Sequence, residues 1–140
     1  MATPRLSKAG VQLREQFDDS FPTRSRASDG WIGDARHSKI ASDHSPDENG
    51  WVRALDITAR LFDEETDTMS DVVEQLRKAA RKDGRLAYII YNKRICSPRT
   101  LWRWRPYRGA NPHTRHAHFS FKKSADNDRK FWNVNLLGGE

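Results

Sequence analysis

Apolar residues recur at the spacing of an amphipathic helix in two stretches of the chain. The first runs from Pro4 to Phe21, and the second, from Thr68 to Lys82, has the more regular apolar stripe. We predict a helix in each stretch. Thr68 or Ser70 is expected to cap the start of the second helix, and Gly84 is expected to end it, because glycine readily adopts the left-handed conformation found after helices.

Three other stretches are rich in β-branched and aromatic residues and are expected to be strands: Trp51 to Thr58, Leu86 to Asn92 and His116 to Phe121. Arg94 to Cys96 is expected to pair back on the second strand through a tight turn. Side chains alternate between the two faces of a strand. Asp56 is therefore expected at the end of a largely apolar face.

The segments between these elements are expected to be loops. Pro22 to Asn49 is rich in Ser, Asp, Arg, Gly and Pro and has no regular spacing of apolar residues. Trp102 to Asn111 is aromatic and basic, and Pro106 and Gly109 favour a loop there. The tail from Lys130 to Leu137 is expected to add a last strand, followed by a frayed end at the final glycines.

A chain of 140 residues has the usual length of one domain, so residues 1–140 are expected to form a single α+β domain. Its small, mainly antiparallel sheet is expected to carry the functional site and to be flanked by two or three helices. The single cysteine, Cys96, excludes an internal disulfide and a cysteine-rich zinc site. Nothing in the sequence requires more than a monomer.

The formal net charge of +6 and the sequence pI of about 9.8 favour an anionic partner. Nucleic acid and bacterial cell wall both fit this description. Met1 to Gln16 lacks the apolar run of an export signal, and no stretch is long and apolar enough to span a membrane. We therefore expect a protein that does not insert into membranes and stays where it is made until another agent releases it.

The five histidines fall in two short segments of the chain. They are His37 and His44 in the first segment, and His113, His116 and His118 in the second. His116 and His118 are two residues apart on an expected strand, so both rings project from one face. Asp56 is expected to reach them from a neighbouring strand, and His44 from the loop before it. Catalytic zinc sites typically use three His or carboxylate ligands and leave one position for water, so the pattern predicts such a site.

Three short motifs resemble those of the superfamily that contains lysostaphin, the D-Ala-D-Ala metallopeptidases and the hedgehog domain. The motifs are Ser42-Asp43-His44, Ala54-Leu55-Asp56 and His116-Ala117-His118. The longer run from Gly30 to Phe121 is more similar to the peptidase domains of actinobacterial phage endolysins. The resemblance implies one zinc ion (Zn2+) held by His44, Asp56 and His118, and hydrolysis of peptide bonds in bacterial peptidoglycan.

The resemblance also implies roles for the other two histidines of the HxxHxH motif. His116 takes the position of the general base, and His113 matches an extra histidine of the penicillin-insensitive murein endopeptidases. The carboxypeptidases of the superfamily have an acidic residue three positions before the last ligand, where this chain has Arg115. This difference favours a histidine as the base, with Asp43 and His37 as alternatives.

Three arginines are candidates for substrate binding. Guanidinium groups bind carboxylates through paired hydrogen bonds, and peptidoglycan stem peptides carry several carboxylates. Arg36, Arg53 and Arg115 are therefore expected to orient the substrate. The resemblance places the activity in phage lysis, with the enzyme held in the host cytoplasm until the membrane is opened. It leaves open which bond is cut and whether that bond is internal or terminal.

A second interpretation is a metal-dependent nuclease or a protein that binds single-stranded nucleic acid. The basic and aromatic run from Trp102 to Arg108 could stack bases and pair with phosphates. Small nucleases of this kind use a strand, a loop and a helix to hold the metal, and no helix is expected after Phe121. A third interpretation is a wall-binding module without catalysis, which the complete set of three histidines argues against. The motifs favour peptidoglycan over nucleic acid as the partner.

Overall fold

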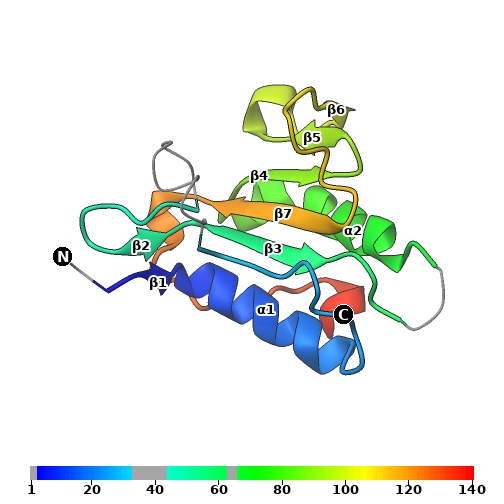
Figure 1. Cartoon of the computed structure of the whole chain (residues 1–140), viewed down its shortest axis with the longest axis horizontal. Coiled ribbons are helices and arrows are strands. Elements are labelled where there is room, and N and C mark those ends of the chain that lie inside the picture. Colours follow the sequence, from blue (N-terminus) through cyan, green and yellow to red (C-terminus); the bar gives the residue numbers. More distant parts are fainter. Residues whose placement is uncertain (1–2, 33–43, 63–65) are drawn as a thin grey trace.

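A five-stranded sheet forms the centre of the computed structural model, which describes residues 3–32, 44–62 and 66–140 (Figure 1). The strands, in their order across the sheet, are β3 (Ala54–Thr58), β7 (His116–Phe121), β4 (Leu86–Tyr91), β5 (Arg94–Cys96) and β6 (Arg105–Pro106). Every neighbouring pair is antiparallel. With two helices packed on it, this sheet confirms the expected α+β class.

The helices α1 (Lys8–Ser20) and α2 (Thr68–Asp83) pack on one face of the sheet. Ala117 and Phe119 of β7 join apolar residues of both helices in a single core cluster. Neighbouring residues of a strand point to opposite faces. The residues that alternate with Ala117 and Phe119 therefore face away from the helices, and they are His116, His118 and Ser120. The histidine-bearing face predicted from the sequence therefore lies on the side of the sheet opposite the helices.

The two ends of α2 were predicted with unequal success. Gly84 ends the helix with a φ of 82°, in the predicted left-handed conformation. The N-cap is Asp67 rather than Thr68 or Ser70, and its carboxylate accepts a hydrogen bond from the backbone N–H of Ser70 at 3.2 Å. The same carboxylate accepts the hydroxyl of Tyr91 from β4, so a tertiary contact helps to fix where the helix begins.

The strand predicted from Trp51 to Thr58 is divided at Arg53. Its first two residues form β2 (Trp51–Val52), which pairs in parallel with β1 (Arg5–Leu6), and the remainder is β3. The Arg53 guanidinium donates hydrogen bonds to Asp126 at 2.8 Å and to Asp47 at 2.7 Å. These two contacts hold the chain at the point where it passes from the short sheet to the large one.

The hairpin predicted between β4 and β5 is confirmed. Its two turn residues, Asn92 and Lys93, have φ values of 50° and 67°, the left-handed conformation that suits the twist of a two-residue hairpin. The loop predicted from Trp102 to Asn111 contains one short strand, β6. Pro106 is compatible with it because β6 lies at the edge of the sheet, where an N–H donor is not required.

The strand predicted from Lys130 to Leu137 is wrong. The segment runs without regular structure to a 3-10 helix, η4 (Asn135–Leu137). The Gln16 side chain on α1 takes the place of a neighbouring strand, because it bonds to both the N–H and the carbonyl of Trp132. The expected fraying is also wrong for Gly139, whose N–H donates to the carbonyl of Val134 at 2.9 Å.

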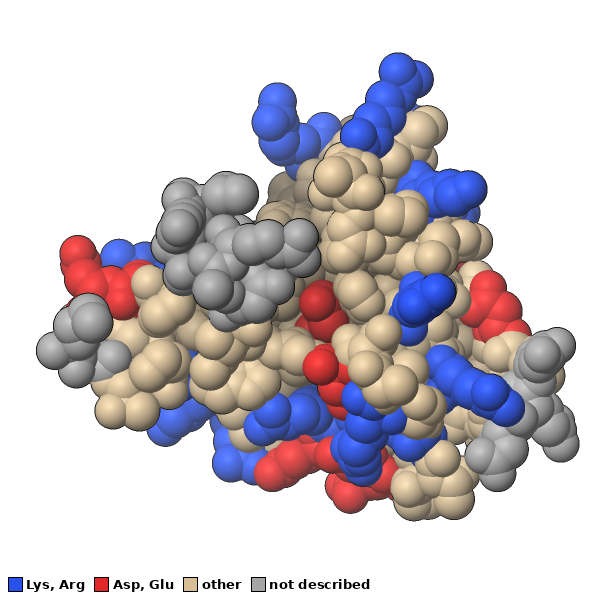
Figure 2. Space-filling view, viewed as in Figure 1, with Lys and Arg blue, Asp and Glu red and all other residues tan. Residues whose placement is uncertain are grey.

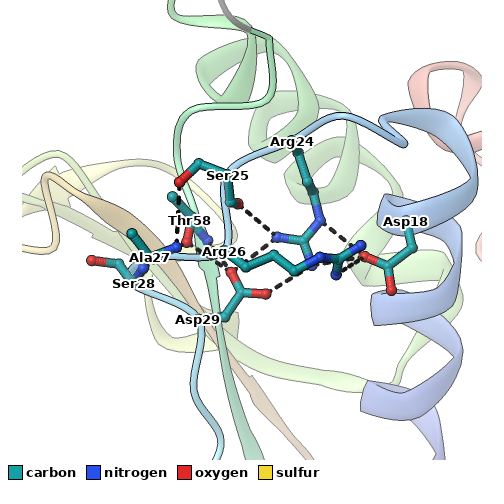
Figure 3. Close-up of polar contacts among 8 residues, drawn as sticks. All are labelled: Asp18, Arg24, Ser25, Arg26, Ala27, Ser28, Asp29 and Thr58. Carbon is teal, nitrogen blue, oxygen red and sulfur yellow. Dashed lines mark hydrogen bonds and ion pairs between the residues drawn. The ribbon is translucent and has the colours of Figure 1, made fainter.

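An arginine buried at the end of α1 holds the start of the long loop after this helix (Figure 3). The Arg24 guanidinium donates to Asp18 and to both oxygens of Asp29, with nearest distances of 2.8 Å to each residue. Asp29 in turn accepts hydrogen bonds from the N–H and hydroxyl of Thr58 on β3. This network places the next residue, Gly30, beside β3, where it forms a bridge with Asp56.

The single cysteine of the chain lies in the core. The Cys96 side chain is fully buried, with 0% exposed, and burial raises the pKa of its thiol to about 12. It is therefore a small apolar component of the core. In residues 3–32, 44–62 and 66–140, no helix has both the length and the apolar character needed to cross a membrane.

Candidate metal centre

Asp56 and His118 face each other across the two strands β3 and β7. They are direct partners in the antiparallel register, and partners of this kind project from the same face of a sheet. His118 Nδ1 lies 3.0 Å from Asp56 Oδ1. The sequence prediction that Asp56 reaches the histidines from a neighbouring strand is confirmed.

His44 approaches Asp56 from the loop before β2. A bridge between Gly30 and Asp56 holds an earlier part of this loop against β3, and the carbonyl oxygen of Trp31 lies 3.0 Å from His44 Nδ1. A carbonyl oxygen only accepts hydrogen bonds, so Nδ1 carries the proton. In the protonated ring Nε2 also carries a proton, which faces Asp56 Oδ2 at 3.4 Å, whereas in the neutral ring Nε2 carries the lone pair. This is the tautomer that a metal ligand needs.

His118 is held by two residues besides Asp56. The Ser120 hydroxyl oxygen lies 2.8 Å from His118 Nε2, and the ring of Tyr88 stacks on the imidazole with 5.4 Å between ring centroids. Tyr88 and Ser120 are partners in the register of β4 and β7. Ser120 lies on the same face as His116 and His118 because side chains alternate along β7. Tyr88 was missed, because only the pairing of β4 with β7 brings it there.

The donor set of His44, Asp56 and His118 fits a divalent metal. The ligand atoms of these residues all lie within 4.8 Å of one another. Two imidazole nitrogens and a carboxylate oxygen are ligands that zinc and similar transition metals bind. We therefore regard the three residues as a candidate metal site.

A second pair of imidazoles lies beside the same carboxylate. His113 Nδ1 and His116 Nε2 are 2.7 Å apart, and His116 Nε2 is 3.5 Å from Asp56 Oδ2. With Asp56, these two histidines form another group with the residue types of a metal site. The 2.7 Å contact is that of a hydrogen bond, so one ring donates a proton to the other. The pair is consequently built to share a proton, whichever ring carries it.

His113 lies outside the strand and is held in place by its backbone. Its φ is 52°, which is uncommon for a residue other than glycine and is often found at functional sites. The N–H of His113 donates to Asn111 Oδ1 at 3.0 Å, and its carbonyl accepts from the N–H of Asn92 at 2.8 Å. The turn between β4 and β5 thus directs the His113 ring toward His116.

The charge states of the cluster follow from burial and from its hydrogen bonds. Burial raises the pKa of Asp56, but hydrogen bonds from His118 and His44 outweigh this effect, and the pKa lies well below its ordinary value. Burial, with further contributions from His118 and His116, lowers the pKa of His113 to about 4. Burial also lowers the pKa of His116, although Asp56 opposes the shift. At neutral pH the cluster combines an ionised carboxylate with a neutral pair, His113 and His116.

A cavity of about 340 Å³ opens beside His116. Arg115 and Thr114, which precede His116 in the chain, contribute to its wall, and Ser28 lines it from the loop that Arg24 anchors. An extended polar ligand in this cavity would lie next to the imidazole of His116. Arg115, a predicted substrate-binding residue, is therefore next to the cluster.

The other two predicted substrate-binding arginines are Arg53 and Arg36, and neither is seen beside the cluster in the described part of the chain. Arg53 bonds to Asp126 and Asp47, so its guanidinium stabilises the chain between β2 and β3 and is not directed at the cluster. The prediction for Arg36 concerns a residue outside the described part of the chain. The same is true of His37 and Asp43, the alternatives for the general base.

The aromatic residues of the basic run mainly serve packing. Trp102 is buried in the core, and the indole N–H of Trp104 donates to Glu74 on α2 at 2.9 Å. Tyr107 is nearest to the cluster, with its ring centroid 5.9 Å from that of His113. Of the three, Tyr107 is the one in ring contact with a histidine of the cluster.

Comparisons with known proteins found no matching family model, no matching curated protein and no matching solved structure.

Proposed function

We propose that this chain is a zinc-dependent peptidase that hydrolyses peptide bonds in the stem peptides or cross-links of bacterial peptidoglycan. The observation that carries the proposal is the gathering of four histidines around Asp56. His118 faces one carboxylate oxygen at 3.0 Å, and His44 and His116 lie 3.4 Å and 3.5 Å from the other. His44, Asp56 and His118 would supply the ligands, and His113 and His116 would share a proton. Bound zinc would polarise the carbonyl of the scissile bond and make water more acidic.

The neutral state of His116 suits it to act as the general base. Its pKa is lowered, so at neutral pH the ring can accept a proton from an attacking water. His113 can share that proton through the 2.7 Å contact with His116. The same pair can return a proton to the amine that leaves. A second role for either ring is hydrogen-bond donation to the oxyanion that forms as water adds to the carbonyl.

The position of Arg115 supports the proposal that the substrate carries carboxylates. Its side chain is exposed and lines the cavity beside His116, where a guanidinium could hold a stem-peptide carboxylate. The net charge of +6 also suits an anionic substrate. We place the activity in phage lysis on the basis of the motif resemblance, with release to the wall after the membrane is opened.

The test compares zinc content with release of new amino groups from purified peptidoglycan. The parent should carry about one zinc per chain and release amines. His118→Ala should lose both zinc and activity, whereas His116→Ala should keep zinc and lose activity. Asp56→Asn should behave like His118→Ala, and Asp71→Asn, which changes an exposed carboxylate on α2, is its matched control.

Two results would contradict the proposal. In the first, the zinc-loaded parent releases no amino groups from peptidoglycan. In the second, the parent degrades single-stranded nucleic acid, and His116→Ala abolishes that activity, which would make the chain a metal-dependent nuclease.

A further inference from the structure

A basic groove of about 430 Å³ lies where β1, β2 and the first turns of α1 meet, at the N-terminal end of the molecule in Figure 1. It shares no lining residue with the cavity beside His116. Four cationic and two aromatic side chains give it its character. They are Arg5, Lys8, Arg14, Arg129, Trp31 and Trp51.

The cations of the groove are only partly neutralised. Arg129 pairs with Glu15, and the Arg5 guanidinium lies over the ring of Trp51, 3.9 Å from its centroid. Lys8 and Arg14 make no ion pair with any described residue, and no described carboxylate lines the groove. Charge complementarity therefore favours a ligand with at least two acidic groups.

The exposure of the two tryptophans indicates which kind of acidic polymer fits the groove. A protein that binds single-stranded nucleic acid needs several open aromatic faces on which successive bases stack. In this groove Trp51 is buried, with only 8% exposed, and Arg5 covers its ring. Trp31 is the more accessible of the two and is half-buried. One indole face among flexible cations suits a sugar ring with acidic substituents better than a run of stacked bases.

The groove is connected to the candidate metal centre through Trp31. The side chain of Trp31 lines the groove, while its carbonyl oxygen accepts the hydrogen bond from His44 Nδ1. A polymer bound in the groove would therefore contact Trp31, whose carbonyl oxygen holds the candidate ligand His44. Anchoring of this kind raises the local concentration of substrate without any contact with the bond that is cut.

We propose that this groove binds an acidic saccharide chain of the bacterial wall, whose sugars carry carboxylates or phosphates. Lys8 and Arg14 pair with the acidic groups, and Trp31 contacts the apolar face of a sugar ring. The bacterial source of the polymer rests on the proposed function. The groove itself is assigned from its charge, its aromatic residues and its volume.

The experiment measures co-sedimentation of the full-length, metal-free protein with purified bacterial walls. The walls are used whole or after chemical removal of their acidic polymers. The parent should bind whole walls more strongly than stripped walls, and increasing salt should weaken the binding. Lys8→Gln with Arg14→Gln should reduce the affinity about tenfold, a change of about 1.4 kcal/mol. Arg81→Gln with Lys82→Gln, which removes the same charge from exposed positions on α2, should bind like the parent.

Three outcomes would overturn the inference. They are equal affinity of the groove and control variants, equal binding of whole and stripped walls, and binding of a thymidine oligonucleotide but not of walls. If the variant with both Lys8→Gln and Arg14→Gln unfolds, the wall affinity of the single variant Arg14→Gln is compared with that of the parent instead. Failure of the proposed function looks different, because the groove would still bind walls while the zinc-loaded parent released no amino groups from them.

Discussion

The environment of His118 is set by its neighbours on β7, β3 and β4. Its Nδ1 faces Asp56, its Nε2 faces Ser120, and the ring of Tyr88 covers one side of the imidazole. Residues that hold the second nitrogen of a metal-binding histidine fix its orientation and its basicity. Ser120 is thus a positioning residue for the candidate ligand.

Removal of the Ser120 hydroxyl should weaken metal binding without removing a ligand. We expect Ser120→Ala to lower the affinity for zinc by about 10-fold to 100-fold while the stoichiometry stays the same. Competition with a chromophoric chelator measures this affinity. Ser124→Ala, at an exposed position in η3 (Lys123–Ala125), is the control. Equal affinities of the two variants would show that Ser120 does not position His118.

The start of α2 shows how one side chain joins two elements. Asp67 caps the helix through the N–H of Ser70 and also accepts the hydroxyl of Tyr91 on β4, 2.6 Å away. Tyr91 is buried in the core, and both burial and Asp67 raise the pKa of its hydroxyl. The hydroxyl therefore stays protonated and donates to the cap.

Loss of this cap should destabilise the protein by more than the loss of an ordinary N-cap does. Removing an N-cap side chain costs about 1 kcal/mol, and leaving a buried hydroxyl without its partner costs about 1–3 kcal/mol more. Asp67→Ala should therefore lower the free energy of unfolding by about 2 kcal/mol or more, measured by urea denaturation. Asp71→Ala removes another exposed carboxylate from the same helical turn, one that does not cap the helix, and should have a much smaller effect. Similar losses for both variants would contradict the role of Asp67.

At the scale of the whole molecule, the charges are unevenly distributed. Between Asp83 and Asp126 the sequence contains no acidic residue, and in Figure 2 Lys and Arg side chains project from the end of the molecule where β5 and β6 lie. Several of the described carboxylates, among them Asp29 and Glu74, take part in ion pairs within the fold. Burial raises the pKa of Asp29, but hydrogen bonds from Arg24 and Thr58 outweigh burial and lower it. Hydrogen bonding to Arg77 lowers the pKa of Glu74 to about 2.

These pKa shifts predict that the metal-free protein loses stability in acid. Folding lowers the pKa of His113 to about 4, so the unfolded chain binds more protons than the folded chain between about pH 6.5 and pH 4, and stability falls over this window. Asp29 and Glu74 act in the same direction, because the stability they contribute is lost below about pH 4. Melting temperatures measured from pH 8 to pH 3 in the presence of a chelator test this. His113→Gln should reduce the fall in melting temperature between about pH 6.5 and pH 4, and Asp29→Asn should reduce the fall below about pH 4. A melting temperature that rises toward acid would contradict the prediction.

The sequence by itself determined the elements whose signals are local. Alternation along residues 116–121 placed His116, His118 and Ser120 on one face, and the helical stripe and Gly84 located the second helix. These signals are reliable because the periodicity of side chains is a property of each strand or helix alone. The expected contact between Asp56 and the histidines also needed only two neighbouring antiparallel strands.

Only the tertiary structure decided the features that depend on distant partners. Arg53 divides a strand because Asp126 lies beside it, and Trp132 ends up in an irregular segment because Gln16 bonds to its backbone. The tautomer of His44 depends on the Trp31 carbonyl in the same way. Hydrogen bonds between residues far apart in the chain have no local sequence period, so the pattern of apolar and polar positions could not reveal them.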